Sequence, residues 1–201
     1  MKTRINFFTL IVALSITVMA KSQSDSSYTK TLFNGTNQIE SGGYGAFSVK
    51  GTQIDNQPSL LIGGRGGWVA NHKYVIGLAG YSIMSNEFKL SGANYNSFYT
   101  GGYGGLYLET ILFSNKLVNL SIPLELGAGK MVRVDDKNAD FGTSFLYAEP
   151  GIEVDLNVSK GFKVSLGTYY KFTGKIGNSN TLSNGLLDGL SVGLQFKWGK
   201  F

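Results

Sequence analysis

Residues 118–126 read VNLSIPLEL, an unbroken alternation of apolar and polar side chains. The apolar residues recur at every second position, which is the period of a β-strand and not the 3.6-residue period of a helix. The same alternation runs through residues 146–156 (LYAEPGIEVDL), and shorter rows cover 162–167 and 192–198. No stretch carries a convincing amphipathic helix. The sequence therefore predicts an all-β fold.

Turn residues divide the body of the chain into eight predicted strands. We place these strands at residues 42–50, 58–70, 73–83, 97–113, 117–132, 143–157, 162–173 and 189–199. Three connections, at 71–72, 114–116 and 159–161, are short, whereas those at 51–57, 84–96, 133–142 and 174–188 are longer and polar. Short turns at one end and longer loops at the other predict an antiparallel up-and-down barrel, and are typical of outer-membrane barrels.

The composition excludes several classes of protein. The chain has 201 residues, 28 of them glycine and none cysteine, so disulfide scaffolds, thiol catalysis and cysteine-bound metals are ruled out. Charged residues make up 15%, against about 25% in ordinary soluble domains. The formal net charge of +5 would suggest an anionic partner such as nucleic acid if it belonged to the folded body.

The first residues are expected to be a signal peptide rather than part of the fold. Lys2 and Arg4 precede an apolar stretch at 7–20 that is too short to span a bilayer as a helix. Cleavage after Ala20 and cleavage before Gln23 both fit, and we favour the second, which gives a signal peptide at 1–22. Its removal takes away three basic residues and no acid, so the argument for nucleic acid disappears. Residues 23–40 are expected to form a flexible arm, and 41–201 the barrel.

Alternation alone does not say which face of the strands is outside. The polar rows contain glycine, serine, tyrosine and isolated charges, not the many lysines and glutamates of a water-exposed surface. This favours a transmembrane barrel over a soluble, lipocalin-like carrier. Aromatic residues near the short-turn ends would meet the membrane interface: Trp68, Phe113, Phe162, Trp198 and Phe201. Phe201 is out of phase with the Val192–Trp198 row, so we expect a bulge near Gly199.

Several short motifs resemble those of a known group. Residues 42–45 (GGYG), 63–68 (GGRGGW), 71–72 (NH) and 77–81, with Gly77, Gly80 and Tyr81, resemble a group of uncharacterised small outer-membrane β-barrel proteins of Gram-negative bacteria. The likeness covers the whole mature chain and, more loosely, extends to the OmpA/OmpX-like eight-stranded barrel. It implies the fold and the outer-membrane location, but no activity and no functional residues.

An eight-stranded barrel is narrow enough to be filled by its own side chains, so a wide pore is not expected. Strand parity predicts an inward polar network that is nearly balanced in charge and plugs the lumen. A proton or small-ion path through this network is the alternative. Its expected charged members are Arg65, Glu109, Glu125, Glu149, Glu153, Asp155, Lys163, Lys171 and Lys197, accompanied by Tyr103, Tyr107, Tyr147, Tyr169 and Gln195.

Nothing in the sequence supports catalysis, a metal or another cofactor. The only histidine, His72, lies in a predicted tight turn, so a serine–histidine hydrolase is poorly supported. Asp136, Asn138 and Asp140 have the spacing of a calcium loop, but Phe141 stands where that loop needs glycine. We expect a solvated acidic loop.

The predicted function is a non-enzymatic barrel whose extracellular loops serve structural or surface-binding roles. Membrane lipid or lipopolysaccharide, and the barrel-assembly machinery during insertion, are the expected partners. A surface or envelope protein partner is a further option. An accessory barrel of a secretion or envelope-assembly machine is the main alternative, followed by the soluble carrier and a lipid-modifying enzyme.

Overall fold

The computed structural model describes residues 40–54, 57–85, 97–135, 138–139, 142–176 and 187–201. The predicted signal peptide and residues 23–39 of the predicted arm lie outside these ranges. No helix in the described part is long and apolar enough to cross a membrane. The strands are β1 (Ser41–Ile54), β2 (Gln57–Ala70), β3 (Tyr74–Ser85), β4 (Ser97–Leu112), β5 (Val118–Asp135), β6 (Asn138–Ala139), β7 (Thr143–Ser159), β8 (Phe162–Ile176) and β9 (Gly189–Lys200).

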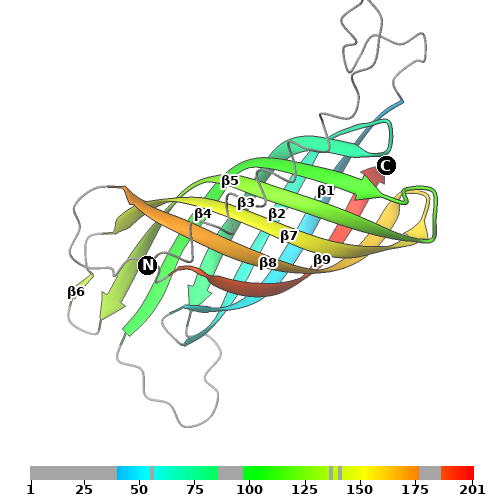
Figure 1. The fold of residues 1–201 in the computed structure, drawn as a ribbon. Helices are drawn as coiled ribbons and strands as arrows, with labels where there is room; N and C mark the ends of the chain where they lie inside the picture. The colour runs from blue at the N-terminus through cyan, green and yellow to red at the C-terminus, as the bar shows by residue number, and fades with distance from the viewer. Residues whose placement is uncertain (1–39, 55–56, 86–96, 136–137, 140–141, 177–186) are drawn as a thin grey trace, which may run out of the picture. The chain divides into compact units, whose positions relative to one another are not determined.

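The strands form one closed antiparallel barrel, as predicted. Its wall consists of eight strands, β1–β5 and β7–β9, which we call the staves. Each stave pairs with its sequence neighbour, β9 pairs with β1, and the two-residue β6 adds only to the end of β5. Figure 1 shows the strands wound around a common axis, with the red C-terminal strand next to the blue first strand. Closure leaves no stave with an unpaired edge, which is what a β structure needs in lipid.

The prediction of a long connection at residues 51–57 is wrong. Residues 51–54 continue β1 and pair with β2 up to Ile54↔Gln57, so only 55–56 separate the two strands. The polar run Gly51–Gln53 had indicated a loop. Outside lipid, however, a strand needs no apolar outer face, so polarity here does not mark the end of pairing.

Other strands also continue further than predicted at the same end. β5 reaches Asp135 and pairs there with β6, and β8 reaches Ile176. Asn138 of the calcium-like spacing therefore lies in a short hairpin strand opposite Asp135. Asp136, Asp140 and Phe141 fall outside the described residues, as do 86–96 and 177–186 of the other two long connections.

The outward face of the barrel is apolar on every stave. Leu78 is 70% exposed, Leu190 62% and Leu166 59%, values that would be costly in water for large aliphatic side chains. Together they form an apolar belt of the kind that lipid covers. The belt settles which face of the alternating rows points outward.

Six tyrosines point into the barrel, and each lies directly opposite a glycine of a neighbouring strand. The opposed glycine leaves space for the phenol ring, because a Cβ at Gly151 would lie 2.4 Å from Cδ1 of Tyr169. This pairing accounts for part of the high glycine content. The pairs are Tyr44↔Gly67, Gly63↔Tyr81, Tyr103↔Gly129, Gly77↔Tyr107, Gly127↔Tyr147 and Gly151↔Tyr169.

Candidate functional site

The interior of the barrel contains ten buried charges, five basic and five acidic. The nine charged residues expected from strand parity all lie there, and none is more than 7% exposed. The tenth is Lys50, which has no accessible surface. Equal numbers of opposite charges allow a low-dielectric interior to stay neutral, provided that the groups are paired.

One network lies towards the short-turn end and is centred on Glu153 of β7. Both terminal nitrogens of Arg65 donate to the Glu153 carboxylate, each over 2.6 Å. Nζ of Lys197 lies 2.9 Å from Oε2 of the same carboxylate, and the hydroxyl of Tyr169 donates to Oε1 over 2.7 Å. Two cations and a phenol thus share one buried carboxylate, a geometry in which the desolvated charge is well compensated.

Lys197 connects this carboxylate to two others. Its Nζ lies 2.9 Å from Oε1 of Glu109 and 3.0 Å from Oδ1 of Asp155. The hydroxyls of Tyr44 and Tyr107 both donate to Oε2 of Glu109, each over 2.6 Å. The network therefore joins residues of six staves and holds opposite walls of the barrel together.

A second network lies nearer the loop end and is centred on Lys50 of β1. Its Nζ lies 3.1 Å from Oε1 of Glu149 and 3.5 Å from Oε1 of Glu125. The ammonium also lies 4.1 Å from the ring centroids of Tyr81 and Tyr169. Tyr169 touches both networks, because its hydroxyl reaches Glu153.

Sequence reasoning missed Lys50, although the signal was present. Phe47 and Val49 flank Ser48, and their outward parity places Ser48 and Lys50 inward. Tyr44 of β1 and Tyr81 of β3 also line the lumen and were not among the predicted residues.

Apolar side chains close the interior on the loop side of the second network. Leu61 and Ile83 are paired across β2 and β3, and both are 1% exposed. Met131, also 1% exposed, and Phe145, 3% exposed, extend this layer to β5 and β7. The charged networks are therefore covered by hydrophobic packing at the loop end.

The predicted interface aromatics divide into two groups. Trp68, Phe113 and Trp198 are exposed outward near the short-turn end, and Phe162 stacks on Trp198 with ring centroids 5.2 Å apart. Phe201 does not join them. The β1–β9 register runs without a shift to Gly43↔Lys200, so the expected bulge near Gly199 is absent.

Phe201 instead lies in the inward phase of β9 and packs inside the short-turn mouth. Its ring centroid is 5.3 Å from that of Tyr44, and Nζ of Lys163 lies 4.1 Å above the ring. The prediction that Phe201 faces lipid is therefore wrong. The physical reason is that Tyr44 and Lys163 offer the ring a packed site without any break in strand pairing.

His72 lies in the β2–β3 turn, where Asn71 and His72 have φ of 52° and 56°. Nε2 of its ring contacts the Glu40 carboxylate, and Nδ1 contacts the main-chain oxygen of Phe201. The hydrogen bond to Glu40, followed by that to Phe201, raises the pKa of His72. The hydrogen bond with His72 in turn lowers the pKa of Glu40. His72 thus ties the start of β1 to the end of β9, and both of its ring nitrogens are engaged in these contacts.

The charged groups of the interior are mostly engaged with one another. Among the described residues, no three histidine, aspartate or glutamate side chains are arranged to hold a metal ion. Each of the five interior carboxylates is within hydrogen-bonding or ion-pair distance of a lysine, an arginine or a hydroxyl. The arrangement therefore resembles a paired polar core.

Comparison with known proteins agrees with the barrel geometry. No protein-family model and no curated protein matches the sequence. Among solved structures, the chain is similar to the N-terminal β-barrel domain of Pseudomonas aeruginosa OprF, with a TM-score of 0.57, 10% identity, and 81% of this chain and 99% of that one covered. It is similar to Neisserial surface protein A, with a TM-score of 0.58, 10% identity, and 82% and 100% covered. The chain therefore has the eight-stranded fold of the small bacterial outer-membrane barrels.

Proposed function

We propose that the protein resides in the outer membrane as a non-enzymatic barrel with a side-chain-filled lumen. It would act as a rigid scaffold for its extracellular loops. The observation that carries this proposal is the inversion of polarity: ten buried charges of balanced sign inside and an apolar belt outside. A soluble carrier of apolar ligands needs the opposite arrangement, with an apolar cavity and a polar exterior.

The filled lumen supports a structural role rather than transport. Lys197 and Lys50 each bridge carboxylates from different staves, and the apolar layer around Leu61 covers the second network. An ion would have to displace these contacts to pass. We therefore expect no stable conductance when the purified protein is added to a planar lipid bilayer. Stable, reproducible openings would contradict the closed lumen.

Location and fold can be tested separately from conductance. A closed barrel in a membrane fraction should migrate faster on a gel when unheated than after boiling. Recovery of the protein in the soluble periplasm, without such a shift, would favour the carrier. Detergent extraction followed by pull-down addresses the remaining alternative, because an accessory subunit of an assembly machine should retain stoichiometric partners.

A further inference from the structure

We propose that the short-turn end of the barrel binds the headgroups of anionic phospholipids through four lysines. Lys73 lies in the β2–β3 turn, Lys116 in the β4–β5 turn and Lys160 in the β7–β8 turn, and Lys200 ends β9. All four are exposed. We call these residues the lysine rim. The proposal rests on the membrane location proposed above.

The distribution of charge singles out this end of the barrel. The lumen is balanced, with five basic and five acidic residues. From residue 40 onwards, the sequence of the loop-end segments carries five basic and six acidic residues, whereas the short-turn end carries the four rim lysines and one acid, Glu40. Glu40 is already engaged by His72. The excess positive charge of the barrel is therefore concentrated at the rim.

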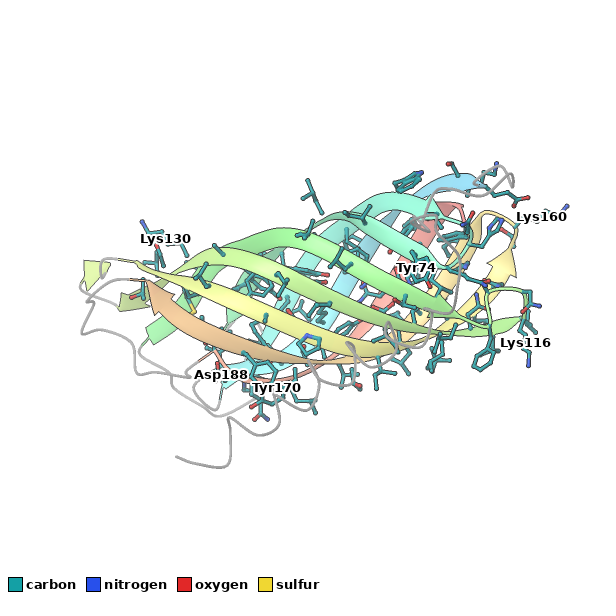
Figure 2. All side chains as sticks on the ribbon, turned by 45° about the horizontal axis from the view of Figure 1, so that its top comes forward. Tyr74, Lys116, Lys130, Lys160, Tyr170 and Asp188 are labelled. Carbon is teal, nitrogen blue, oxygen red and sulfur yellow. The ribbon has the colours of Figure 1, made fainter. Side chains whose placement is uncertain are left out.

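Figure 2 shows where two of the rim lysines lie. Lys116 and Lys160 project from one end of the barrel, while Lys130 and Asp188 lie near the other. Within the described residues, none of the four rim lysines has a carboxylate within ion-pair distance. Exposed ammonium groups at one end of a barrel that crosses a membrane are suited to bind the phosphate groups of the adjacent lipid surface.

The neighbouring aromatic residues favour a lipid surface over a dissolved acidic protein. Nζ of Lys116 lies 5.2 Å from the ring centroid of Phe113, which is itself exposed. Lys200 follows Trp198 on the outward row of β9. Exposed aromatic rings settle at the headgroup level of a bilayer, and a lysine stem beside them can extend its charge to the phosphates. The rim lysines thus lie at the level where headgroups would be.

The tryptophans provide a local probe for the test. Trp68 and Trp198 are the two tryptophans of the chain, and both lie at the short-turn end, 40% and 52% exposed. The full mature protein would be reconstituted in vesicles of phosphatidylcholine and phosphatidylglycerol, with one lipid or the other carrying bromine. Bromine quenches tryptophan fluorescence on contact, so the ratio of the two quenching curves measures the lipid preference next to the rim.

We expect a preference of about threefold to fivefold for phosphatidylglycerol, the factor that about one lysine near a lipid surface supplies. The ratio of quenching by the two lipids should approach one at about 0.5 M salt, because the Debye length there is only a few ångström. It should also approach one when Lys73, Lys116, Lys160 and Lys200 are all replaced by glutamine. Lys130→Gln, at the opposite end, is the matched control and should keep the preference.

The two proposals fail in different ways. Equal quenching by both brominated lipids in the wild type would overturn the headgroup proposal and leave the membrane location intact. A preference that survives the quadruple replacement would overturn it as well. Absence of quenching by either lipid would refute the membrane location itself. If the quadruple variant does not fold, Lys116→Gln and Lys160→Gln, each in an exposed turn, should each lower the preference measurably.

Discussion

Arg65 of β2 and Glu153 of β7 meet inside the barrel in a two-pronged ion pair, with both N–O distances at 2.6 Å. The two strands are not neighbours in the sheet, so the pair crosses the lumen. Removing one member of a buried ion pair leaves the other charge desolvated and uncompensated, whereas replacing both with apolar groups is much less costly.

Replacing Glu153 with glutamine should strongly destabilise the barrel. Arg65, Lys197 and Tyr169 all bind this carboxylate, so two cations lose a partner at once. We expect the free energy of unfolding to fall by about 3–5 kcal/mol, measured by urea titration of the refolded protein in vesicles. Lys130→Gln, which removes one exposed charge, is the control. A double variant Arg65→Met/Glu153→Leu should recover part of the loss, and a double variant less stable than Glu153→Gln would contradict this account.

Gly151 should not tolerate alanine, because the added methyl group would occupy the space of the Tyr169 ring. A Cβ at this position would lie 2.4 Å from Cδ1 of that ring. Over-packing of this kind costs about 1–3 kcal/mol. Gly45→Ala provides the comparison, since a Cβ at Gly45 would meet nothing within 4 Å. Equal stability of the two variants in the same urea assay would argue against the tyrosine–glycine pairing.

His72 should titrate above its ordinary value of 6.5. It is the sole histidine, so an untagged protein in micelles should show a single imidazole signal by NMR. Glu40→Gln removes the largest cause of the shift and should lower the pKa of His72. Lys200→Gln should raise it slightly, because Lys200 repels the imidazolium. A pKa of His72 that does not respond to Glu40→Gln would show that the two side chains do not interact.

The contact between His72 and Glu40 also implies a pH window for stability. A histidine whose pKa is raised by folding contributes stability that is complete below its unfolded value and is lost as the pH rises through the folded value. Glu40, whose pKa is lowered, contributes above its unfolded value of 4.5 and loses that contribution as the pH falls through the folded value. The pair should therefore be strongest between about pH 4.5 and 6.5. Comparing unfolding of the wild type and His72→Gln across this range would check it, and a difference that grows above pH 8 would contradict it.

Phe201 should contribute to stability through the lumen and not through lipid contact. Phe201→Ala is expected to cost about 1–3 kcal/mol, less than for a fully buried phenylalanine because the ring is only half-buried. In a double-mutant cycle with Lys163→Met, the coupling should be about 0.5–2 kcal/mol, as expected for a cation over an aromatic face. Zero coupling would place the ring away from Lys163.

Much of the architecture was readable from local patterns. The alternating row at 118–126 and the short turns at 71–72, 114–116 and 159–161 predicted the eight staves and their antiparallel order. Strand parity alone identified nine of the ten buried charges, Glu153 and Arg65 among them. This succeeded because the side-chain period of a strand is two, so one known inward residue determines the orientation of its whole row.

What the sequence by itself determined is the set of strands and which residues share a face. Only the tertiary structure decided that the apolar face is outside, that Lys50 sits between Glu125 and Glu149, and that Phe201 turns inward onto Tyr44. The sequence overestimated the first, third and fourth long connections, because a strand beyond the lipid belt loses its apolar row while it keeps its pairing partners. Pairing across the barrel depends on strand register and closure. These bring together residues such as Arg65 and Glu153 that are 88 positions apart, and no local pattern encodes that distance.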